Sequence, residues 1–88
     1  MKVTVLYRSN SEQERTVLDF ERDFLHQTGQ HLELYDLNTR DGWSMAALYD
    51  VVQYPAVLAM TVDGQLLQMW QGENMPRINE VSYYTASN

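Results

Sequence analysis

The chain has 88 residues, a length that holds one domain with a modest core. Its net charge of −6 and scattered basic residues exclude a nucleic-acid or anionic-membrane partner, because both recognise clustered Lys and Arg. The chain has no cysteine, which excludes disulfides, thiolate nucleophiles and thiolate-bound zinc. We therefore expect a single domain over residues 1–88, with a frayed tail at 85–88.

The first residues predict a strand followed by a helix. Residues 3–7 are apolar and β-branched, which is typical of a strand and not of a signal peptide. Val17, Phe20 and Phe24 then recur at helical spacing, and Gly29 is a natural C-cap. No apolar run approaches the roughly 20 residues of a membrane span, so we expect a cytoplasmic protein.

A second strand and a second helix follow. Residues 31–37 predict the strand, and residues 38–42 form a polar turn in which Asp41 is a candidate N-cap. The apolar positions after this turn repeat at three and four residues and predict a helix of about three turns: Met45, Leu48, Tyr49 and Val52. Tyr54 precedes Pro55 and is pushed out of the helical region, so the helix ends before it.

The last third of the sequence predicts a hairpin and a third helix. Residues 56–62 form an apolar run that ends at Asp63-Gly64, a strong hairpin signal, and residues 65–71 supply the partner strand. Residues 74–76 indicate the cap and first turn of a helix that continues to about Tyr84. The element order is βαβαββα.

This order, with a proline at the start of the third strand, resembles the thioredoxin fold in its glutaredoxin-sized form. Residues 48–58, LYDVVQYPAVL, resemble the family's Y-x-V-x-x-x-P-T-x-x passage, and Gly72 stands where the family has a glycine after its fourth strand. The resemblance covers residues 2–84 and implies an α/β fold with a four-stranded mixed sheet flanked by three helices. It also implies a cis Tyr54–Pro55 bond. The competing ferredoxin-like arrangement is opposed by the Asp63-Gly64 hairpin.

The family's redox motif, Cys-x-x-Cys or Cys-x-x-Ser, lies between the first strand and the first helix. Here residues 8–15 read RSNSEQER, and Ser11 and Glu14 fall at the two cysteine positions. Ser-x-x-Glu is a capping box, in which the hydroxyl accepts from the Glu14 N–H and the Glu14 side chain returns to the Ser11 N–H. A serine nucleophile needs a base in reach, and both histidines, His26 and His31, lie at the far end of the predicted fold. We expect no catalytic residue, cofactor or metal.

A glutathione-binding protein is the alternative interpretation. Tyr7 and Ser9 or Ser11 lie in the region that glutathione transferases use, and Tyr54-Pro55-Ala56-Val57 resembles their V-P-A-L passage. The E-S pair that follows their fourth strand is missing, because residues 70–73 read WQGE. This alternative implies weak glutathione binding with little or no catalysis.

The resemblance also implies a groove that holds an extended peptide. Its positions come from three loops: Arg8, Ser9, Asn10 and Ser11; Tyr54 and Pro55; Gly72 and Glu73. The residue before the proline would pair its backbone with the peptide, so the expected partner is a protein. The open fourth strand allows a monomer or a weak homodimer. We expect Trp43 and Trp70 to cover core or edge in preference to forming an interface.

Overall fold

The computed structural model describes residues 2–72 and 74–85. In that part of the chain seven elements follow one another: β1 (Lys2–Tyr7), α1 (Glu12–Thr28), β2 (Glu33–Asp36), α2 (Arg40–Leu48), β3 (Ala56–Met60), β4 (Leu66–Gln71) and α3 (Ile78–Thr85). The predicted order βαβαββα is confirmed. Glu73 and the predicted tail beyond Thr85 lie outside the described residues.

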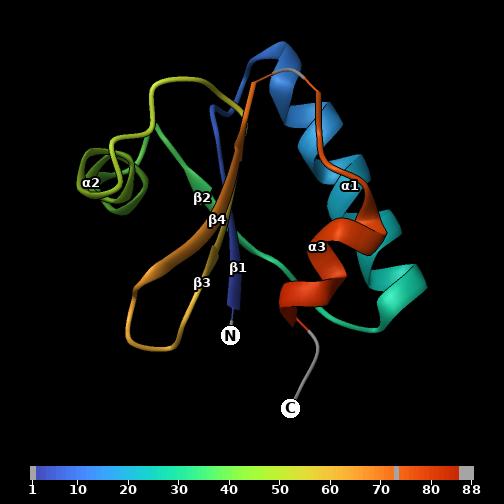
Figure 1. Cartoon of the computed structure of the whole chain (residues 1–88). Helices are drawn as coiled ribbons and strands as arrows, with labels where there is room; N and C mark the ends of the chain where they lie inside the picture. The colour runs from blue at the N-terminus through green and yellow to red at the C-terminus, as the bar shows by residue number, and fades with distance from the viewer. Residues whose placement is uncertain (1, 73, 86–88) are drawn as a thin grey trace.

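One mixed sheet forms the middle layer, with strand order β2-β1-β3-β4. β2 runs parallel to β1, while β3 is antiparallel to both β1 and β4. Figure 1 shows α1 and α3 on one face of the sheet and α2 on the other. The predicted α/β fold class is therefore confirmed, and the ferredoxin-like arrangement is excluded because a short turn, not a helix, joins β3 to β4.

The alternation of side chains along the strands divides the core between the two faces. The cluster facing α1 and α3 centres on Val5, Phe24 and Val81. The cluster facing α2 centres on Leu6 and Leu58. All five residues of β3 are buried, as expected for a central strand covered on both faces.

The helix α2 begins and packs differently from the prediction. Its N-cap is Thr39, whose hydroxyl accepts from the Gly42 N–H at 3.2 Å, and not Asp41. Gly42, in the first turn, lies so close to the end of β2 that a Cβ atom would overlap the Asp36 carbonyl, so this position requires glycine.

The predicted apolar stripe of α2 was right for Met45 and Tyr49, which pack against the core, and wrong for Leu48 and Val52. Leu48 and Val52 are each 74% exposed, while the small residues Gly42 and Ala46 are buried against the sheet. Small side chains allow the helix to approach closely, a role that a pattern of large apolar residues does not indicate. The helix ends at Leu48, well before the predicted end.

The helix α3 begins later than predicted, at Ile78 instead of residues 74–76. Its start is held by Glu80, whose carboxylate accepts from the Arg77 N–H at 3.0 Å. Trp70 on β4 lies under this helix and packs edge-on against Tyr84 with ring centroids 5.7 Å apart. The expectation for Trp70 is thus confirmed, whereas Trp43 on α2 is 66% exposed.

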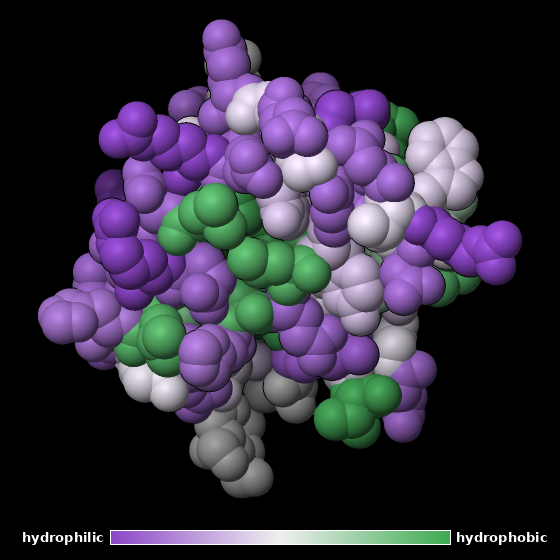
Figure 2. Space-filling model, turned by 180° about the vertical axis from the view of Figure 1, so that it is seen from behind, coloured by the Kyte–Doolittle hydropathy of each residue, from purple (hydrophilic) through white to green (hydrophobic). Residues whose placement is uncertain are grey.

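The surface seen from behind is mostly hydrophilic (Figure 2). Its apolar side chains gather in small groups and form no broad patch on this face. This face therefore shows no large hydrophobic docking surface.

Candidate functional site

Ser11 caps the N-terminus of α1. Its hydroxyl accepts from the Gln13 N–H at 3.3 Å and donates to the Arg8 carbonyl at 2.5 Å. The predicted capping box with Glu14 was wrong, because the Glu14 N–H donates to the Ser11 backbone carbonyl at 3.2 Å. The side chain that reaches back is Gln13, whose Oε1 accepts from the Arg8 N–H at 3.3 Å. The Ser11 oxygen thus serves as a structural cap.

The loop before Ser11 is anchored to the end of β2. Asp36 Oδ1 accepts from the Ser9 N–H at 3.1 Å and from the Asn38 N–H at 2.9 Å. Hydrogen bonding from the Ser9 side chain, followed by these backbone groups, lowers the pKa of the Asp36 carboxyl. Asn10 has a φ of 59°, the left-handed conformation that Asn tolerates better than most residues.

Tyr7 lies beside this loop at the end of β1. Burial, and then the carboxylates of Asp36 and Glu14, raise the pKa of its phenol above 10.0. The phenol is therefore neutral at pH 7, which disfavours a tyrosinate as nucleophile or base at this end of the sheet.

The segment that precedes β3 forms the opposite wall, and its Tyr54–Pro55 peptide bond is cis. Gln71 at the end of β4 holds this segment, since its Oε1 accepts from the Val52 N–H at 3.0 Å and from the Gln53 N–H at 3.2 Å. The Tyr54 hydroxyl donates to the Val51 carbonyl at 3.0 Å, which fixes the direction of the ring.

Gly72 closes this wall on the β4 side. Its N–H donates to the Pro55 carbonyl at 3.1 Å, and its φ of 109° lies in the region that favours glycine. A Cβ atom at this position would come within 3.2 Å of Gln53 Oε1. The glycine therefore allows β4 to pass close beside the proline loop.

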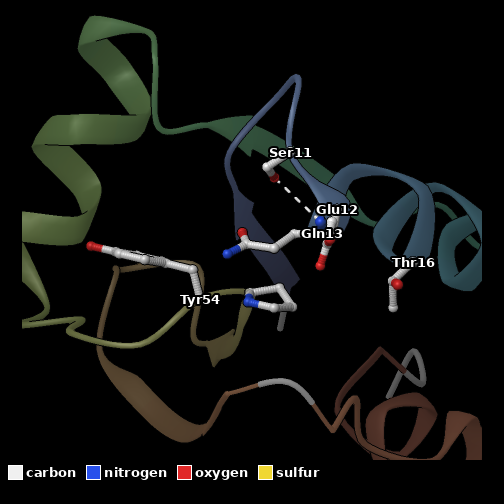
Figure 3. Close-up of a pocket in the computed structure, with 6 residues that line it drawn as sticks. Ser11, Glu12, Gln13, Thr16 and Tyr54 are labelled. Atoms are coloured by element: carbon white, nitrogen blue, oxygen red, sulfur yellow. Dashed lines mark hydrogen bonds between the residues drawn. The ribbon is translucent and has the colours of Figure 1, made fainter.

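A groove of about 490 Å³ lies between the two walls (Figure 3). Its lining residues are Ser11, Glu12, Gln13, Thr16, Tyr54 and Pro55. The predicted positions Ser11, Tyr54 and Pro55 are brought together here, and Gly72 lies behind Pro55. Arg8, Ser9 and Asn10 support the groove without lining it, and Glu73 lies outside the described residues.

Glu12, Gln13 and Thr16 are groove residues that the sequence interpretation missed. They lie in the first turns of α1, at a spacing that places them on one helix face. The sequence signal that could have identified these residues is the helical spacing counted forward from Ser11. Glu12 is exposed and belongs to no ion pair within residues 2–72 and 74–85, so the groove carries a free negative charge.

The Tyr54 backbone lies in the segment that forms one wall of the groove. In the described part of the chain, neither its N–H nor its carbonyl has a hydrogen-bond partner. Such a donor and acceptor pair on one residue is the pairing element of a strand edge. The groove therefore offers a place where an extended chain can add hydrogen bonds.

Both histidines lie far from this groove. His26 lies in the last turn of α1, and His31 Nδ1 contacts Glu21 at 3.6 Å, both at the opposite end of the helix from Ser11. The described residues contain no cluster of three or more His, Asp or Glu side chains placed to bind a metal ion. No helix among them is long and apolar enough to cross a membrane.

The geometry defines a thioredoxin-type architecture in which a capped helix faces a cis-proline loop, and comparison with solved structures supports this assignment. Thioredoxin 1 from the thermophilic eubacterium Thermosipho africanus superposes with a TM-score of 0.66 over 97% of this chain and 90% of that chain, at 15% sequence identity. The chain thus has the thioredoxin fold. No protein-family model matches the sequence, and no curated protein matches it significantly.

The absence of cysteine separates this chain from thiol–disulfide chemistry. Exchange requires a thiolate that attacks a disulfide sulfur, and the sequence contains no thiol. Thioredoxin fold and missing thiols are together consistent with a redox-inactive module.

Proposed function

We propose that this protein is a non-enzymatic binding module whose groove holds an extended segment of a partner protein. The observation that carries the proposal is that the N–H and carbonyl of Tyr54 have no hydrogen-bond partner among the described residues. A partner chain adds to this residue by main-chain hydrogen bonds, and the groove beside it receives the partner's side chains. This mode of binding requires neither a thiol nor a metal.

The hydrogen bonds that anchor the groove walls support this role. Gln71 fixes the loop before Tyr54, and Ser11 with Gln13 fixes the turn into α1. A preformed site loses less conformational entropy on binding than a loop that has to order. The anchoring therefore favours recognition of a flexible segment by a fixed surface.

The negative charge of the groove weighs against glutathione as the ligand. Glutathione carries two carboxylates, and Glu12 would face them without a compensating cation among the described residues that line the groove. We therefore favour a protein segment over the glutathione-binding alternative, and a direct titration separates the two.

The test is selection from a displayed library of random octapeptides, with the purified protein as target. We expect enriched peptides whose binding shifts the amide NMR signals of Ser11, Tyr54 and Gly72. The variant Thr16→Trp fills the groove and should abolish this binding, because Thr16 lines it. The matched control Gln27→Trp places the same ring on an exposed position of α1 outside the groove and should bind as the wild type does.

Two results would overturn the proposal. One is a library that yields no peptide sensitive to Thr16→Trp. The other is saturable binding of glutathione alone, with shifts at the same three residues, which would establish the alternative function.

A further inference from the structure

A second hollow lies beside α2 and shares Tyr54 with the groove. This hollow has a volume of about 140 Å³ and is lined by Trp43, Ala46, Ala47, Asp50, Val51 and Tyr54. Tyr54 lines both spaces, and Figure 3 shows its ring extending from the proline toward α2. The second hollow is therefore adjacent to the residue with which a bound chain is proposed to pair.

The walls of this hollow combine two aromatic side chains, Trp43 and Tyr54, with one carboxylate. Trp43 is 66% exposed, so its ring is available to a ligand. Ala46 and Val51 are buried and form an apolar floor. Asp50 is the only charged residue in the lining, and it belongs to no ion pair in the described part of the chain.

Asp50 occupies a backbone position that favours glycine. It follows the C-cap of α2 with a φ of 57°, where helices usually end with Gly or Asn. The side chain at this position adds a carboxylate to the hollow that glycine would not supply. Asn and Gly both adopt this conformation, so the charge can be removed without disturbing the end of the helix.

We propose that the hollow binds a Lys or Arg side chain of the segment held in the groove, an inference that rests on the proposed function. The aliphatic stem of that side chain packs on Ala46 and Val51, its cationic head lies on the face of Trp43, and the Asp50 carboxylate pairs with the charge. The occupant is thus an extended basic segment of a partner protein.

Charge complementarity favours this occupant over an apolar one. An apolar side chain would cover the Asp50 carboxylate without giving it a partner, which costs desolvation free energy. Glu12 adds a second negative charge on the other side of Tyr54, and the whole chain carries −6. This field attracts a basic segment and repels an acidic one.

The experiment compares the selected peptides with their neutral counterparts. We expect Lys or Arg to dominate at one position of the octapeptides that depend on Thr16. Replacement of that residue by Gln in the synthetic peptide should weaken binding to the wild-type protein about tenfold, as expected for a cation–π contact with an added ion pair. Against Asp50→Asn or Trp43→Leu, the same replacement should weaken binding only about twofold.

Asp63→Asn is the matched control, since it removes one exposed carboxylate at the β3–β4 turn and should keep the tenfold difference. Groove-dependent peptides without a preferred basic position would overturn the inference and leave the proposed function intact. A preferred basic position would also overturn the inference if its replacement by Gln weakens binding to Asp50→Asn and Trp43→Leu as much as binding to the wild type. That result would likewise leave the proposed function intact. A library without any groove-dependent peptide would overturn both.

Discussion

Thr4 lies in the middle of β1 and is fully buried, yet its hydroxyl has no hydrogen-bond partner within the described residues. An unpaired buried hydroxyl costs about 1–3 kcal/mol. Thr4→Val has nearly the same shape, and we expect it to raise the free energy of unfolding by about 1 kcal/mol in urea denaturation. Thr61→Val should lower it instead, because the Thr61 hydroxyl accepts from the Gln65 N–H at 3.1 Å. A loss of stability in Thr4→Val would show that its hydroxyl is satisfied.

Asp36 makes the stability of the groove loop depend on pH. Its pKa in the folded protein lies below the ordinary value of 3.8, with hydrogen bonding from the Ser9 side chain as the largest cause. The carboxylate therefore stabilises the fold fully above pH 3.8, and this contribution is lost as the pH falls through the folded pKa. We expect the melting temperature to drop between pH 5 and pH 2 by less in Asp36→Asn than in the wild type. Equal drops would contradict the assignment.

The loop between α2 and β3 is positioned by one side chain from another element. Gln71 Oε1 accepts two backbone N–H groups, from Val52 and Gln53. Gln71→Leu removes both hydrogen bonds and should cost about 1–2 kcal/mol of stability, with faster amide hydrogen exchange at both residues. Gln71→Glu keeps the acceptor and should retain the protection and the peptide affinity. If Gln71→Leu leaves exchange at both amides unchanged, Gln71 does not position this loop.

The elements that the sequence predicts well are those with local signals. The periodicity of α1, its Gly29 C-cap and the Asp63-Gly64 turn all depend on neighbouring residues, and each is present in the structure. The packing of α2 depends instead on the close approach of Gly42 to the end of β2, which is a contact between elements. The same distinction applies to the groove. Tyr54 was predicted from the local sequence around Pro55, whereas the role of Gln71 depends on contacts between β4 and the loop before β3.

At the scale of the whole molecule, the exposed β4 edge of the sheet bears on the oligomeric state of the protein. β4 is an edge strand without a charged residue, which leaves it open to pairing with a second copy. Two features oppose such pairing. Gln68 Oε1 accepts from the Met69 N–H at 2.9 Å, and the pairing of β3 with β4 is irregular at Ala59 and Met60. We therefore propose that the protein is a monomer whose net charge of −6 adds repulsion between copies.

This proposal predicts that Gln68→Val promotes self-association. The substitution releases the Met69 N–H and adds a β-branched residue to the edge, so two copies of β4 gain a free donor and a better strand former. Sedimentation equilibrium from micromolar to millimolar protein should show a monomer for the wild type and concentration-dependent dimers for Gln68→Val. Gln27→Val adds the same side chain to α1 and should stay monomeric. This control distinguishes pairing at the β4 edge from nonspecific hydrophobic association. A wild-type protein that already dimerises, with Gln68→Lys abolishing the dimer, would show that the Gln68 side chain does not protect this edge.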